Sequence, residues 1–338
     1  MRKLVVSLLA IGLVISNSLF AQDQHKKITL KFDTRFDAQY QSSTEDSIND
    51  ASGINGKYLK IIVNGEINDK FSYNFRQRLY LNAYEGYKGY FNATDWAYLN
   101  YNINENFTLS AGKQVVAIGG FEYDYAPIDM YFWSDFWENV VCYQLGASIN
   151  FKSLNKKHNL GFQITNSPFA QEAMSNIYSY NLIWYGDFDW FKTIYSTNMV
   201  EYQKGHFINY IALGNQFKVD RFTLEVDYMN RASAKQDNFF SDFSLIGNLI
   251  FKVNNKINIF SKGGYDQNKA QDRGVSFAYD RFVKPGVKYC FYGLGAEYFP
   301  IKDSKDVRLH AYWATNNANP KYNNFNLGIR WQMKVLER

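Results

Sequence analysis

The segment 112–136, GKQVVAIGGFEYDYAPIDMYFWSDF, gathers groups that could do several kinds of chemistry. It contains a Gly pair, one Pro and many aromatic side chains, and its four acids are Glu122, Asp124, Asp129 and Asp135. Gly112-Lys113 suggests a loop that binds the phosphates of a nucleotide. Such a loop requires a Gly where Phe107 stands and a Ser or Thr where Gln114 stands, so a nucleotide site is excluded.

Residues typical of enzymes and metal sites form no recognisable pattern elsewhere. The four histidines lack the spacing of metal ligands, and the sequence has no GxSxG nucleophile motif. A barrel hydrolase could use a Ser and a His on its outer face near the membrane edge. His158 and His206 fall at predicted strand starts, but neither has a convincing Ser partner. The sequence therefore predicts no catalytic residue, no metal and no cofactor.

The N-terminal residues have the composition of an export signal. Arg2 and Lys3 precede an apolar stretch from Leu4 to Ile15, and a small residue, Ala21, follows at a suitable cleavage position. We therefore expect residues 1–21 to be a signal peptide and residues 22–338 to form one domain. The net charge is +5, or +3 without Arg2 and Lys3, which is too balanced to suggest nucleic acid as a partner.

Aromatic content is the most informative feature of the composition. Phe, Trp and Tyr make up 18% of the residues, and after the signal no apolar run approaches the roughly 20 residues of a membrane helix. Amphipathic aromatic side chains are enriched at membrane interfaces. Two exported classes fit, a membrane β-barrel and a large soluble all-β protein.

Apolar and polar residues alternate along most of the chain, as in a strand with one apolar and one polar face. In the segment 325–335, FNLGIRWQMKV, Phe, Leu, Ile, Trp, Met and Val alternate with Asn, Gly, Arg, Gln and Lys. Similar alternation covers 30–41, 71–83, 137–151, 222–228, 243–253 and 307–313. No helical periodicity follows the signal.

The connections between these segments alternate between short turns rich in Asn, Asp and Lys and longer loops. This is the layout of an outer-membrane barrel, with short periplasmic turns and longer external loops. One connection, near 203–205, is short where a long loop is expected. The segment count predicts a transmembrane antiparallel β-barrel of about sixteen strands, with both termini on the periplasmic side.

A closed sheet follows from the physics of the bilayer. Every backbone N–H and C=O in hydrocarbon must be paired internally, so only helices or closed sheets can span it. A barrel of this size leaves a water-filled lumen, which explains the polar faces. Alternation alone also fits an exported β protein that forms no channel, such as an adhesin or glycan binder, and this alternative stays open.

The stretch LSAGKQVVAIGGFEYDYAPID resembles the phosphate-selective porin O and P family, in its Tyr- and Asn-rich branch. The residues that carry the resemblance are Gly112, Lys113, Gln114, Gly119, Gly120 and Glu122. The resemblance implies a sixteen-stranded, trimeric, passive channel in the outer membrane of a Gram-negative bacterium. It also implies contact with membrane lipid and lipopolysaccharide, and passage of small hydrophilic solutes with a preference for anions such as phosphate. The alternative among channels is a substrate-specific barrel for oligosaccharides.

Basic residues on the polar faces of the first three and last two strands predict a positive lumen wall. These residues are Arg35, Lys60, Arg76, Arg78, Arg308 and Arg330, accompanied by Lys31 and His310. Such a wall would raise the local anion concentration. The inward acids Asp33, Asp37 and Glu66 would partly cancel it. Arg76 and Arg78 are the strongest candidates because they share a face in mid-strand, where we expect no acid beside them. The alternative is an ordinary polar face without selectivity.

The opening segment joins the fifth and sixth predicted strands, so we expect it to fold into the lumen as a constriction loop. Gly119 and Gly120 would let the chain turn inward, and Pro127 would stiffen it. Its acids would then face the basic wall around Arg76 and Arg78 and oppose pure anion selectivity. The alternative is an external loop that packs over the rim.

Overall fold

The computed structural model describes residues 27–45, 48–79, 92–170, 175–232, 239–270, 283–318 and 320–337. The expected signal peptide, residues 1–21, lies outside these ranges. The described strands are β1 (Ile28–Ser43), β2 (Ala51–Glu66), β3 (Phe71–Arg78), β4 (Thr94–Asn102), β5 (Phe107–Val115), β6 (Tyr143–Lys152), β7 (His158–Asn166), β8 (Tyr178–Phe188), β9 (Phe191–Gln203), β10 (His206–Val219), β11 (Phe222–Ala232), β12 (Phe243–Lys252), β13 (Ile257–Gln267), β14 (Lys288–Tyr298), β15 (Val307–Asn316) and β16 (Tyr322–Glu337).

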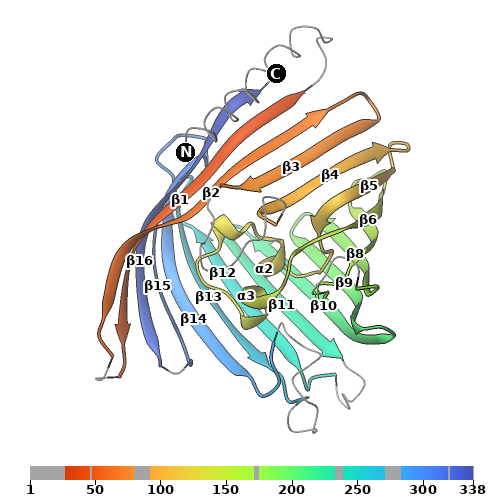
Figure 1. Cartoon of the computed structure of the whole chain (residues 1–338). Helices are drawn as coiled ribbons and strands as arrows, with labels where there is room; N and C mark the ends of the chain where they lie inside the picture. Colours follow the sequence, from red (N-terminus) through yellow and green to blue (C-terminus); the bar gives the residue numbers. More distant parts are fainter. Residues whose placement is uncertain are drawn as a thin grey trace, which may run out of the picture.

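The sheet closes on itself, because β16 pairs antiparallel with both β15 and β1 (Figure 1). Arg35 of β1 lies opposite Arg330 of β16, which in turn lies opposite Arg308 of β15. Closure therefore makes the first and last strands neighbours, and the predicted barrel of about sixteen strands is confirmed.

The outer face of the barrel is apolar, as the alternation predicts. On β16, Leu327 is 64% exposed while its neighbour Asn326 is 6% exposed, and Phe325, Met333 and Val335 are also exposed. An outward apolar band of this kind is the surface that a bilayer covers. None of the helices in the described part of the chain is long and apolar enough to cross a membrane.

Short turns gather at one rim of the barrel and longer connections at the other. In three of the short turns, the side chains of Asn68, Asn104 and Asn254 each accept hydrogen bonds from two backbone N–H groups just ahead. This local bonding explains why Asn marks these turns. The connection at 204–205 is short although it lies at the long-loop rim.

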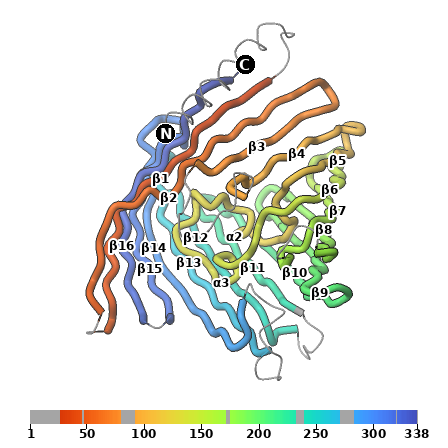
Figure 2. The backbone as a smooth tube through the Cα atoms, in the orientation of Figure 1, coloured from red at the N-terminus to blue at the C-terminus, as the bar shows by residue number. Residues whose placement is uncertain are grey.

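The connection between β5 and β6, residues 116–142, folds into the barrel, and Figures 1 and 2 show it surrounded by strands. We call it the constriction loop. It contains the short helices α2 (Phe121–Asp124), η2 (Pro127–Asp129) and α3 (Asp135–Asn139). The strand predicted over 137–151 is therefore wrong at its start. Ser134 caps α3 by accepting from the Trp137 N–H, and β6 begins only at Tyr143.

An apolar cluster inside the barrel holds the loop. Val116, Ile118, Tyr123 and Phe136 of the loop are buried together with residues of β9, β10 and β11, among them Tyr210. Burial of such side chains contributes about 1.5–3 kcal/mol each. The loop is thus a packed element of the interior.

Candidate functional site: the lumen and its constriction loop

The loop enters the lumen along a row of side-chain amides and hydroxyls. The Gln163 side chain accepts from the Ala117 N–H, and Asn198 donates to the Ala117 carbonyl, each at 2.8 Å. The Gly119 N–H donates to the Ser196 hydroxyl at 2.8 Å. Strands β7 and β9 thereby satisfy the backbone of a segment that has no strand partner of its own.

The Gly pair turns the chain where the sequence predicts a turn. Gly120 has φ of 100°, a conformation that L side chains rarely adopt. A Cβ on Gly119 would lie 2.7 Å from the carbonyl oxygen of Ile194, so the loop also approaches the wall closely there. Directly afterwards, the Asp227 carboxylate accepts from the backbone N–H groups of Phe121 and Glu122 at 2.8 and 2.7 Å.

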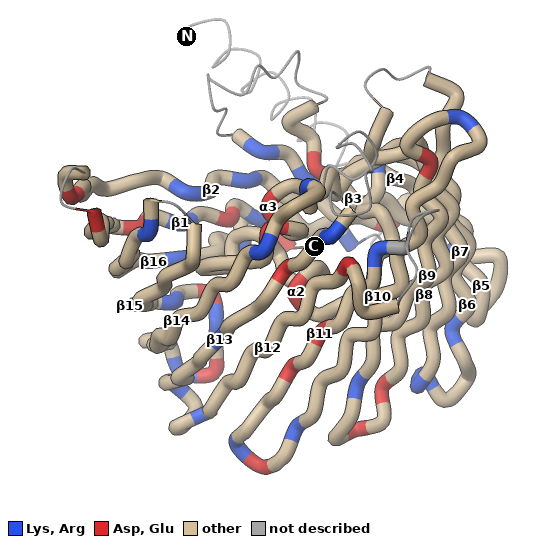
Figure 3. The backbone as a smooth tube through the Cα atoms, turned by 90° about the horizontal axis from the view of Figure 1, so that it is seen from below, with Lys and Arg blue, Asp and Glu red and all other residues tan. Residues whose placement is uncertain are grey.

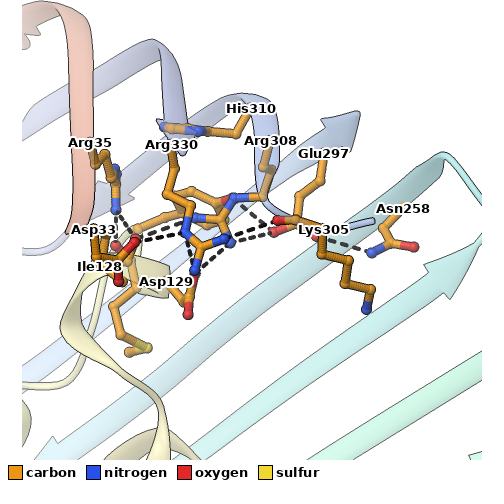
Figure 4. A network of polar contacts seen from close by, with 12 residues as sticks. Asp33, Arg35, Ile128, Asp129, Asn258, Glu297, Lys305, Arg308, His310 and Arg330 are labelled. Carbon is orange, nitrogen blue, oxygen red and sulfur yellow. Dashed lines mark hydrogen bonds and ion pairs between the residues drawn. The ribbon is translucent and has the colours of Figure 1, made fainter. Parts of the chain in front are cut away.

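The loop crosses to the wall made by β1, β15 and β16, where η2 meets a cluster of charges (Figure 4). Arg308 lies 2.7 Å from Asp129 and 3.4 Å from Glu297, and it also donates to the carbonyl of Ile128. Arg330 lies 3.4 Å from Asp33 and 3.9 Å from Asp129. Two guanidinium groups therefore stand among three carboxylates.

Arg35 also makes its polar contacts within the protein. It pairs with Asp37 at 2.6 Å and donates to the carbonyls of Ile128 and Met130. His310 Nε2 lies 3.0 Å from Oδ1 of Asp37, the oxygen that also accepts from Arg35 Nε. Gly328 gives this pair room, because a Cβ there would come within 2.4 Å of both side chains. Arg35 thus anchors the loop and carries no excess charge.

The four acids of the loop lie in different surroundings. Glu122 is buried, pairs with Lys262 of β13 at 2.7 Å and accepts from both the N–H and the hydroxyl of Ser134. Asp135 accepts from Asn139 within α3, and burial raises the pKa of its carboxyl. Asp124 is exposed to the lumen.

These positions correct one expectation. The loop acids were expected to face the wall around Arg76 and Arg78. Instead, Glu122 pairs with β13, and Asp129 pairs with β15 and β16. The reason is the path of the loop, which crosses from β11 to the β15–β1 wall and leaves β3 on its other side.

The second basic cluster joins β2, β3 and β4, and we call it the Asp95 cluster. Lys60, Arg76 and Arg78 lie 3.3, 2.7 and 2.9 Å from the Asp95 carboxylate. The expectation that no acid stands beside Arg76 and Arg78 is therefore wrong. The guanidinium of Arg76 also lies 3.5 Å from the ring centroid of Trp96 and donates to the Tyr143 hydroxyl.

A bulge explains why Asp95 points inward. Arg76 pairs with Trp96, but the next residue, Gln77, pairs with Thr94, so Asp95 is the extra residue. Strict alternation would place Asp95 on the same face as Leu99, which is exposed on the outer surface. A bulge shifts this register and turns the carboxylate toward the lysine and arginines.

The described basic residues of the lumen therefore differ in how many carboxylates lie beside them. Arg308 and Arg330 share three carboxylates, whereas Lys60 and Arg76 pair with one carboxylate of the described residues, that of Asp95, which Arg78 also contacts. Figure 3 shows basic and acidic positions together around α2 and α3. Because Arg stays charged at all relevant pH values, Lys60 and Arg76 together exceed the charge of Asp95 among the described residues of the β2–β3 wall.

Three cavities surround the loop. One of about 350 Å³ lies against β11 to β16 toward the short-turn rim and reaches Lys305. A second of about 370 Å³ lies against β3 to β8 and includes Arg76 and Asp124. A third of about 280 Å³ lies on the long-loop side, between Met130–Trp133 and strands β1, β2 and β14 to β16.

Neither metal ligands nor paired cysteines gather in the described part of the chain. No group of three or more His, Cys, Asp or Glu there could hold a metal ion. Cys142 and Cys290 are both free, and burial raises the pKa of the Cys142 thiol to about 11. At neutral pH that thiol is therefore protonated.

The comparisons agree with the barrel fold. Residues 28–187 match the family model of phosphate-selective porin O and P. A solved anion-selective porin from Comamonas acidovorans is similar, at 11% identity and a TM-score of 0.63, over 91% of this chain and 100% of that chain. The outer-membrane protein OmpT of Vibrio cholerae is similar at 11% identity and a TM-score of 0.61, over 92% and 99%. No curated protein matches the sequence.

Proposed function

Because this chain is an outer-membrane porin whose residues 28–187 belong to the phosphate-selective porin O and P family, we propose that it is a passive channel that favours small anions. The proposal covers hydrophilic solutes in general, with phosphate among the anions that the family name suggests. Transport through a fixed lumen needs no catalytic step, and we propose no enzymatic activity.

The observation that carries the anion preference is the Asp95 cluster. Lys60 and Arg76 pair with one carboxylate between them in the described part of the chain, and this leaves positive charge on a wall that borders the lumen. Partial exclusion of bulk water strengthens such a field and concentrates anions. Two of the loop acids, Glu122 and Asp129, act against it only weakly, since each pairs with its own partner, whereas the exposed Asp124 opposes it.

The rest of the assembly follows from the same proposal. Residues 1–21 are a signal peptide, the short-turn rim faces the periplasm, and the long-loop rim faces lipopolysaccharide. The barrel assembles as a homotrimer, and the constriction loop with Glu122, Asp124, Asp129 and Asp135 limits the size of the solutes that pass.

The test is reconstitution of the purified, heat-modifiable protein into planar bilayers with KCl. The proposal predicts stable ohmic channels that are more permeable to chloride than to potassium. Liposome swelling with neutral sugars of increasing size gives the size limit. Absence of conductance from a correctly folded barrel would contradict the proposal, and a channel that prefers potassium would overturn the anion preference alone.

A further inference from the structure

The cavity of about 280 Å³ on the long-loop side has the features of a binding site, and none of the Asp95 cluster residues lines it. Its floor is Met130–Trp133 of the constriction loop. Its walls carry Gln39 near the end of β1 and Asn324 near the start of β16, which are the long-loop ends of those strands. A solute that enters from that rim along this wall therefore meets the cavity before it meets the loop.

Aromatic rings dominate the lining. Tyr58, Tyr131, Phe132, Tyr289 and Tyr312 all border the cavity. The ring of Tyr312 lies 5.0 Å from that of Tyr131, and Tyr289 stacks on Phe291 at 5.8 Å. These contacts fix the rings before any ligand arrives, so binding loses little side-chain entropy. Fixed aromatic faces favour a solute with a flat apolar face.

Lys57 supplies a positive charge that no described acid neutralises. The Lys57 amino group lies more than 4.0 Å from every described carboxylate. The nearby Arg35, in contrast, donates its hydrogen bonds to Asp37 and to carbonyls of the constriction loop. A second bulge brings Lys57 inward. Arg35 pairs with Tyr58, but Phe36 pairs with Gly56, so Lys57 is the extra residue. By strict alternation it would share the outward face of Leu59.

Asn326 adds an unsatisfied hydrogen-bonding group. Its side chain is 6% exposed and borders the cavity, yet its Oδ1 accepts no hydrogen bond within the described structure. A buried acceptor without a donor destabilises the protein unless a ligand or water supplies the hydrogen bond. Together with Gln39 and Asn324, it provides partners for hydroxyl groups.

From these features we infer that the cavity binds a sugar acid, a single pyranose ring with hydroxyl groups and one carboxylate, ahead of the constriction. The ring lies on the tyrosine faces, the hydroxyls meet the amides, and the carboxylate meets Lys57. The volume suits one ring, since typical ligand pockets begin at roughly 300 Å³. The inference rests on the proposed channel function and names one class of solute for it.

The test is current block of the reconstituted full chain by D-glucuronate, with D-glucose and acetate at the same concentration. We expect only glucuronate to interrupt the current. Lys57→Met should weaken its apparent affinity by about 10-fold or more, since a charge-assisted hydrogen bond is lost. Asn326→Leu should weaken it less. Lys305→Met removes the same charge from the other cavity and is the matched control, with affinity close to that of the original chain.

Equal block by acetate would mean that no ring is recognised, and equal block by glucose would mean that no charge is recognised. Either result overturns the inference, as does an unchanged affinity in a heat-modifiable Lys57→Met protein. Conducting channels without block overturn the inference alone, whereas a folded barrel without conductance overturns the proposed function.

Discussion

The Asp227 carboxylate of β11 accepts a hydrogen bond of 2.7 Å from the backbone N–H of Glu122, a residue 105 positions earlier in the constriction loop. Its other oxygen accepts from the Phe121 N–H at 2.8 Å. One wall side chain thus holds the first turn of α2, immediately after the positive-φ glycine. This contact ties the loop to the lumen wall at the start of α2, after its contacts with β7 and β9.

Replacement of Asp227 by Ala should loosen the loop. A typical hydrogen bond contributes about 0.5–1.5 kcal/mol, and the two backbone donors would be left buried without an acceptor. We expect more current noise in open channels and faster cleavage of the loop by added protease.

Asp227→Asn is the matched control, because it keeps one acceptor oxygen and nearly the same volume. Its effect should be intermediate. Equal noise and equal cleavage rates in all three proteins would mean that Asp227 does not hold the loop.

Deletion of Glu122–Asp129 should raise the single-channel conductance. The deleted residues cross the lumen between β11 and the β15–β1 wall and include the contacts of Asp129 with Arg308. A Gly/Ser replacement of the same length is the control and should raise conductance less. Unchanged conductance in a heat-modifiable deletion variant would contradict a constricting role for this segment.

Asp124 should make selectivity depend on pH. Protein atoms crowd its carboxyl although water reaches it, and this burial, with the nearby charge of Glu225, raises the pKa of Asp124. As the pH falls, Asp124 is therefore protonated earlier than an ordinary Asp, whose pKa is about 3.9. Loss of its negative charge should increase the chloride-over-potassium permeability ratio.

Asp124→Asn should show the higher ratio already at neutral pH and should lose this part of the pH dependence. Reversal potentials between neutral and acid pH measure both effects. A wild-type ratio that stays constant with pH would argue against a role for Asp124 in the lumen.

Much of the barrel could be predicted from the sequence because alternation reports a strand face directly. Phe325, Leu327, Met333 and Val335 are exposed on the outer surface, and their neighbour Asn326 is buried. The long connection between the fifth and sixth strands also indicated the infolded loop. Both features depend on residues that are close together in the sequence, so the sequence of one chain is enough to predict them.

The two bulges could not be predicted in this way. Alternation assigns Lys57 and Asp95 to the outer face, and only the pairing with β1 and β3 shows that each is an extra residue turned inward. Alternation alone therefore does not identify Asp95 as the acid that pairs with Arg76 and Arg78. Residues 137–139 belong to α3 and not to a strand. So short a helix contains too few residues for the spacing of its apolar side chains to indicate a helix in the sequence.

We propose that the positive charge of Lys60 and Arg76 in excess of Asp95 makes the channel favour anions. The double variant Arg76→Ala/Arg78→Ala leaves Lys60 paired with Asp95. The control is Lys192→Ala, which removes a positive charge that pairs with Asp187 at the short-turn rim. The reversal potential of single channels in a KCl gradient measures the outcome most directly. The account predicts a clear fall in the chloride-over-potassium permeability ratio for the double variant and little change for the control. An unchanged ratio in a folded, conducting double variant would contradict it.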